Sequence, residues 1–143
     1  MENNPKDLLK QTTIIYLSLI SGQLLVCMVI VFLNMGNETV TGSIFNYIAP
    51  VISLGTISAA FFFKGIHQNK AKQLTDETEK LEHFRASNIM RWALVEGGTL
   101  TMVIFFFLEN NYLYLGLFAL GMVAFSMLRP TVESLREDYG LKI

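Results

Sequence analysis

The sequence has few charged residues and a single cysteine, and these two shortages exclude several classes of protein. Only 16% of the 143 residues are charged, against about 25% in an ordinary soluble domain. Cys27 has no second cysteine to pair with, which excludes an intrachain disulfide and a cysteine zinc site, and we expect it to fill apolar space. A formal net charge of -1 leaves no basic surface for nucleic acid.

The common catalytic and metal-binding motifs are also missing. The sequence contains no glycine-rich phosphate loop and no G-x-S-x-G elbow. His67 and His83 lack a metal-ligand spacing such as H-E-x-x-H, so we expect both to be solvated polar residues. We therefore expect no enzyme activity, no cofactor and no metal.

Apolar residues, by contrast, make up 52% of the chain and gather in four long runs. A helix needs about 20 apolar residues to cross a bilayer, and unsatisfied backbone groups exclude open strands in lipid. A soluble four-helix bundle would need a polar face on each helix, which these runs do not offer. We predict one all-α membrane domain over 1–143, a bundle of four transmembrane helices. The predicted spans are 14–33, 44–63, 89–108 and 112–128.

The lysines and arginines predict how these helices are oriented. All 11 of them lie before the first span, around the segment 64–88 or in the tail 129–143. The connections 34–43 and 109–111 contain none. Because basic residues stay on the cytoplasmic side, we expect both termini in the cytoplasm and the protein in the inner membrane of a bacterium.

Two segments on this basic side have helical patterns of their own. Residues 75–85 read as an extension of the third helix, with Thr75 or Asp76 as its N-cap. Residues 131–139 read as a short amphipathic helix that ends at Gly140. The alternative is a solvated connection and a frayed tail. The apolar residues expected to pack on the bundle end or the membrane surface are Leu74, Leu81, Phe84, Leu135 and Tyr139.

The two halves of the chain show a weak internal similarity. A shift of 75 residues lays LISGQLL at 19–25 on LVEGGTL at 94–100. This favours two helical hairpins of equal orientation, as in a parallel repeat, although apolar segments also align by chance. In the repeat, Glu96 takes the position of Ser21.

Glu96 is the one carboxylate within the predicted spans, and the functional hypotheses depend on it. It stands seven residues beyond Ile89, roughly 10 Å into the hydrocarbon core. A charge at the centre of a bilayer costs about 2.5–3.5 kcal/mol even on lenient scales. A carboxyl group in this position can take up and release a proton, or bind a cation.

Polar and small residues at similar depth are candidates to surround this carboxyl group. We expect Gln23 to form a hydrogen bond with Glu96, and Ser21 and Thr56 to shape the same site. Arg91 is expected to extend toward the cytoplasmic interface rather than pair with Glu96. Glycines allow helices to approach closely. The predicted helix-packing glycines are Gly22, Gly55, Gly97, Gly98 and Gly121.

Three interpretations of Glu96 remain open at this point. The first is a structural pair with Gln23 that only fixes the helix register. The second is a carrier of protons or ions. The third is a contact to a partner subunit or to lipid.

The stretch 79–97, EKLEHFRASNIMRWALVEG, resembles a signature of uncharacterised four-helix membrane proteins of Bacteroidota. The Arg-Pro-Thr ending at 129–131 extends this resemblance over most of the chain. It implies the four-helix fold and no particular activity. The phrase RWALVEG at 91–97 is more distantly similar to the rotor-ring proteolipids of rotary ATPases, whose mid-helix carboxylate carries a proton or sodium ion.

The proteolipid resemblance would make Glu96 the ion carrier, but the chain departs from that family. It lacks the alternating glycine helix, its carboxylate lies on the first helix of a hairpin, and the segment 64–88 is longer than a proteolipid turn. Our leading prediction is therefore a self-associating protein or an accessory subunit of a membrane complex, with the lipid bilayer and its own copies as partners. The alternative is a proton- or ion-handling protein that uses Glu96.

Overall fold

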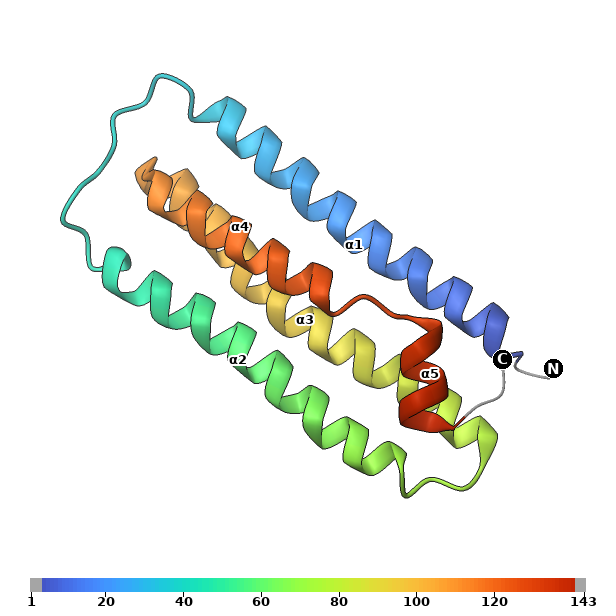
Figure 1. The fold of residues 1–143 in the computed structure, drawn as a ribbon. Helices are drawn as coiled ribbons and strands as arrows, with labels where there is room; N and C mark the ends of the chain where they lie inside the picture. Colours follow the sequence, from blue (N-terminus) through green and yellow to red (C-terminus); the bar gives the residue numbers. More distant parts are fainter. Residues whose placement is uncertain (1–3, 141–143) are drawn as a thin grey trace.

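The computed structural model describes residues 4–140, and every regular element in this range is a helix (Figure 1). This confirms the all-α prediction. The elements are α1 (Pro5–Leu33), α2 (Phe45–Ala71), α3 (Glu77–Glu109), α4 (Tyr112–Met127) and α5 (Val132–Tyr139).

The helix α3 lies at the centre of the bundle and contacts α1, α2 and α4. α1 and α3 run in the same direction, while α2 and α4 run the opposite way (Figure 1). The chain thus forms two hairpins of equal orientation, the arrangement that a duplication would require. The first hairpin is open, because α1 packs mainly on α3 rather than on α2.

Three of the helices, α1, α2 and α3, are long and apolar enough to cross a membrane. α4 has 16 residues, or about 24 Å of helix, which is shorter than a hydrocarbon core of about 30 Å. It is followed by α5 after a bend of 62°, and the count reaches four only if this bent pair forms one span. α2 continues through Pro50 without a break in the helix.

The two predicted helical segments on the basic side are present. Asp76 is the N-cap of α3, and its side chain accepts a hydrogen bond from the Glu79 amide at 3.1 Å. α5 begins with a capping box at Thr131 and ends at Gly140, whose φ of 64° suits glycine. The buried apolar cluster that joins these segments to the bundle consists of Ala71, Leu81, Phe84, Leu135 and Tyr139.

The opposite end of the bundle is held by hydrogen bonds from the connection between α1 and α2. The Asn34 side-chain amide donates to the Phe106 carbonyl at 2.8 Å. The Val40 amide donates to the Glu109 carbonyl at 2.8 Å. The Glu109 carboxylate is itself buried and accepts a hydrogen bond from the Tyr114 hydroxyl. These contacts tie α1 to α3 at the end without basic residues.

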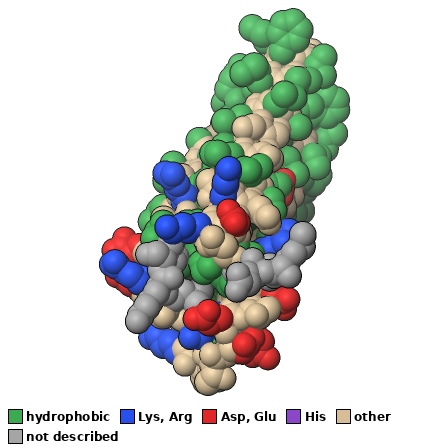
Figure 2. Space-filling view, turned by 90° about the vertical axis from the view of Figure 1, so that its right-hand side faces the viewer, with side chains coloured by type: hydrophobic (Ala, Val, Ile, Leu, Met, Phe, Trp, Pro, Cys, Tyr) green, Lys and Arg blue, Asp and Glu red, His purple; other side chains and the backbone are tan. Residues whose placement is uncertain are grey.

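On the face seen in Figure 2, the charged side chains lie in the lower part of the molecule, and the upper part shows mainly hydrophobic side chains and no charged ones. Many large apolar residues along the helices are exposed, among them Leu25, Met28, Val51 and Phe62. An apolar surface of this extent suits lipid as the surrounding solvent.

Candidate functional site

Glu96 lies on α3 and is half-buried. Among residues 4–140, its carboxylate has no hydrogen-bond or ion-pair partner, and its backbone carbonyl accepts from the Thr99 hydroxyl at 3.0 Å. The carboxyl group therefore lies at the surface of the bundle within the apolar stretch of α3, without a polar partner from this part of the chain.

The predicted hydrogen bond between Gln23 and Glu96 is absent, and this expectation was wrong. Gln23 is buried, and its side-chain oxygen accepts a hydrogen bond from the Thr99 hydroxyl at 2.6 Å. Its side-chain amide nitrogen is buried and has no hydrogen-bond partner in the described part of the chain. Gln23 thus fixes the register of α1 against α3, the structural role foreseen for it, but through Thr99.

The two other residues predicted beside Glu96 do not form a polar shell around it. Ser21 is exposed on α1. The Thr56 hydroxyl donates within α2, to the carbonyls of Ile52 at 3.0 Å and Ser53 at 3.1 Å. The structure therefore gathers neither side chain around the carboxyl group as hydrogen-bond partners.

Only two of the five predicted packing glycines are at close helix contacts. A Cβ atom at Gly98 would overlap the Thr56 hydroxyl, and one at Gly121 would overlap the Thr99 methyl group. Gly98 therefore brings α3 against α2, and Gly121 brings α4 against α3. The other three, Gly22, Gly55 and Gly97, have open space where a Cβ would lie, so they do not pack helices within the chain.

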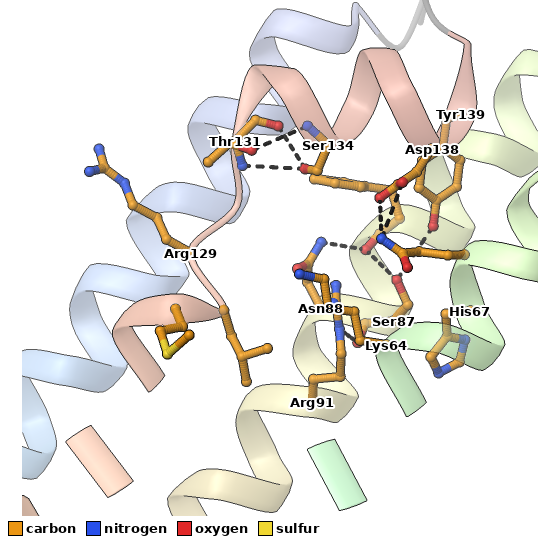
Figure 3. A pocket seen from close by; sticks show the side chains of 14 residues that line it. Lys64, His67, Ser87, Asn88, Arg91, Arg129, Thr131, Ser134, Asp138 and Tyr139 are labelled. Atoms are coloured by element: carbon orange, nitrogen blue, oxygen red, sulfur yellow. Dashed lines mark hydrogen bonds between the residues drawn. The ribbon is translucent and has the colours of Figure 1, made fainter. Parts of the chain in front are cut away.

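A second polar site, not predicted from the sequence, lies at the basic end of the bundle. It is a pocket of about 150 Å³ enclosed by α2, α3, α5 and the end of α4 (Figure 3). Arg91 reaches it from α3 by extending toward the basic end, where it donates to the Ser87 carbonyl at 3.1 Å and the Asn88 side-chain oxygen at 2.8 Å. This is the direction that the sequence predicted for Arg91.

The two histidines lie beside this pocket, and the prediction that both are solvated was wrong. The centroids of their rings are 5.3 Å apart, and the His83 Nδ1 is 2.8 Å from the Tyr139 hydroxyl oxygen. Burial lowers the pKa of His67, and the positive charges of Arg91 and Lys70 lower it further. Burial also lowers the pKa of His83, with further contributions from His67, Lys70 and Arg91.

One feature of the sequence indicates this pocket. Lys64, His67 and Gln68 follow one another on one face of α2 at spacings of three and four residues. Such a polar stripe directly after an apolar span indicates a face that meets other elements. Which elements meet it depends on how α3 and α5 pack, and this is visible only in the structure.

Long apolar helices, a surface suited to lipid and a charged end define the class of the protein as a helical membrane bundle. No family model, curated protein or solved structure matches the chain. The resemblances drawn from 79–97 and 91–97 thus remain predictions.

Proposed function

We propose that the chain is a four-span protein of a bacterial inner membrane that associates with copies of itself, with both termini and the pocket end in the cytoplasm. α4 would form a short fourth span, and α5, which lines the pocket, would lie on the cytoplasmic side. The asymmetric distribution of lysine and arginine supports the orientation.

The observation that carries self-association is the unpartnered carboxyl group of Glu96. A polar group in hydrocarbon gains free energy when a second helix supplies a hydrogen bond. Gly97 lies next to it with open space at its Cβ position, so a partner helix can approach closely at this point. On α1, Gly22 has the same open space and Ser21 is exposed. A second copy would cover these positions, which the chain leaves unused for its own packing.

The proton- or ion-handling alternative gains no support from the surroundings of Glu96. A carrier site needs polar groups that hold the ion in place of water. Gln23 and Thr56, which were expected to supply them, form hydrogen bonds with Thr99 and with the backbone of α2 instead. The open position of Glu96 therefore favours a contact with another chain.

The test is native mass spectrometry of the full chain in a mild detergent, with Glu96→Gln and Glu96→Leu compared. We expect the wild type and Glu96→Gln to form the same oligomer, because glutamine keeps a hydrogen-bonding group. Glu96→Leu should weaken association about tenfold, which corresponds to about 1.4 kcal/mol and lies within the range of about 1–2 kcal/mol found for hydrogen bonds between model membrane helices.

Four outcomes would contradict or change this proposal. A monomeric wild type, or equal association of Glu96→Leu, would remove the self-contact. Oligomers that contain a different protein would assign the chain as an accessory subunit instead. If Glu96→Gln assembled normally but the wild type reacted with a membrane-permeant carbodiimide in a pH-dependent way, a carrier role would replace the purely structural one.

A further inference from the structure

The pocket at the basic end is a polar cavity in a chain whose surface is otherwise largely apolar, and self-association through Glu96 does not involve it. It is lined by Lys64 from α2, Arg91 from α3, and Arg129 and Asp138 from the C-terminal segment. The lining thus includes three cationic residues and one carboxylate. Figure 3 shows the Arg129 side chain directed away from the cavity, which leaves Lys64 and Arg91 as its cations.

The carboxylate in the lining, Asp138, keeps its negative charge and lies close enough to Arg91 to stabilise its positive charge, without forming an ion pair with it. Both oxygens of Asp138 accept from the Gln68 side-chain amide, each at 3.2 Å. Arg91 has no carboxylate at ion-pair distance within residues 4–140, although its guanidinium is partly buried. A partly buried cation without a counter-ion is costly unless an anion from outside pairs with it.

His67 also lines the pocket, but its ring nitrogens do not open into it. Both nitrogens are buried and have no hydrogen-bond partner within residues 4–140. Because a water molecule in the cavity cannot reach either nitrogen, a ligand there would touch the ring carbons of His67. The cationic donors that the lining offers to a ligand are therefore those of Lys64 and Arg91.

Size restricts the identity of this group. About 150 Å³ is below the range of about 300–1,000 Å³ typical of pockets for drug-sized ligands and cofactors. A single tetrahedral anion fits such a volume, and its oxygens accept from lysine and arginine N–H groups. We propose that Lys64 and Arg91 form a binding site for one phosphate group, carried by a phospholipid headgroup or present as free phosphate.

The test uses the full chain in detergent and the fluorescence of Trp92, which is the one tryptophan of the sequence. Its indole N–H donates to the Leu128 carbonyl at 3.0 Å, and Leu128 lines the pocket. Thermal unfolding followed at this fluorophore should shift upward when a ligand binds the folded state. One arm adds sodium phosphate, with sodium chloride at equal ionic strength as its control. The other adds bicelles that contain phosphatidylglycerol, with phosphatidylcholine bicelles as their control.

The variants are chosen so that misfolding does not obscure the result. Lys64→Gln removes one cation whose side chain forms no hydrogen bond within residues 4–140, and it should weaken binding about tenfold, as expected for the loss of one charge-assisted contact. Arg91→Gln should have the same or a larger effect if it folds. Lys72→Gln is the matched control, because Lys72 is exposed at the end of α2 and lies outside the pocket.

The outcomes separate the two sources of phosphate. A shift with phosphate alone assigns the site to the free anion, and a shift with phosphatidylglycerol alone assigns it to a headgroup. Equal shifts with phosphate and chloride, together with no preference for phosphatidylglycerol, would overturn the proposal. So would a Lys64→Gln protein that binds as the wild type does.

Discussion

α1 and α3 are parallel helices that the internal similarity aligns, yet they occupy very different positions. α1 is the more apolar of the two, but only 11% of its apolar stretch is buried inside the chain, against 44% for α3. In water we would expect the opposite relation, because the most apolar helix would be the most buried one. In lipid, apolar side chains gain little from burial, and close packing and polar contacts decide which helix is central.

The sequence of α3 contains the features that favour a central position. Gly98 admits α2, and Thr99 meets both Gln23 of α1 and Gly121 of α4. Trp92 adds a hydrogen bond to the end of α4. α1 has fewer anchors, and its buried residues are Thr12, Tyr16 and Gln23. The comparison therefore predicts large effects for substitutions on the buried face of α3 and small effects on the faces that meet lipid.

The largest effect is expected from a matched pair of adjacent glycines on α3. Gly98→Leu should lower the free energy of unfolding by about 3 kcal/mol, because the new side chain overlaps Thr56 on α2. Gly97→Leu has open space and the same gain in helix propensity. It should be neutral or slightly stabilising in dilute detergent. Unfolding by sodium dodecyl sulfate, followed by circular dichroism, measures both. Equal losses for the two variants would mean that α2 does not approach α3 at Gly98.

Substitution of Gln23 should have a smaller effect, because it removes one contact of a peripheral helix. Gln23→Leu breaks the hydrogen bond from Thr99, and Thr99 keeps its bonds to the Val95 and Glu96 carbonyls. Polar contacts between membrane helices contribute about 0.6 kcal/mol on average, so we expect a loss near that value in the same unfolding assay. Ser18→Ala is the control, since Ser18 is exposed and bonds only within its own helix. A larger loss for Ser18→Ala would contradict the assignment of Gln23 as the anchor.

The features that the sequence predicted well are those determined by neighbours along the chain. The apolar runs, the N-cap at Asp76 and the end of α5 at Gly140 depend on local periodicity and capping, and all were confirmed. The fourth run was predicted as a shorter span over 112–128, and α4 covers almost all of this run, but the helix passes the length criterion for a span only together with α5. The bend that follows it depends on how α5 packs against the bundle.

The features that the sequence could not predict depend on which helix faces meet. Gly97 and Gly98 are equivalent in the sequence, and only the rotation of α3 places one against α2 and the other in the open. Because of the same rotation, Gln23 forms its hydrogen bond with Thr99 instead of Glu96. His67 and His83 are 16 residues apart in the sequence and become neighbours only because α2 and α3 pack against each other at the basic end of the bundle.

The smallest predicted effect concerns pH and is confined to the end of α3 that meets α2 and α5. His67 and His83 have lowered pKa values in the folded chain because both are buried. The positive charges of Arg91 and Lys70 lie near both histidines, the two histidines lie near each other, and the Tyr139 hydroxyl lies next to His83. The unfolded chain therefore binds more protons than the folded chain once the pH falls below about 6.5, the ordinary value for histidine. This part of the stability is complete at pH 7.5 and should decrease as the pH falls through 6.5 to 5.5.

The melting temperature of the wild type should drop over this interval by a few degrees, a range that corresponds to about 1 kcal/mol or less. A variant with both His67→Gln and His83→Gln should show a clearly smaller drop. If the melting temperatures of the two proteins drop by the same amount, the histidines do not titrate in a buried environment. The tight packing of α3 would then not extend to the segment that contains His83.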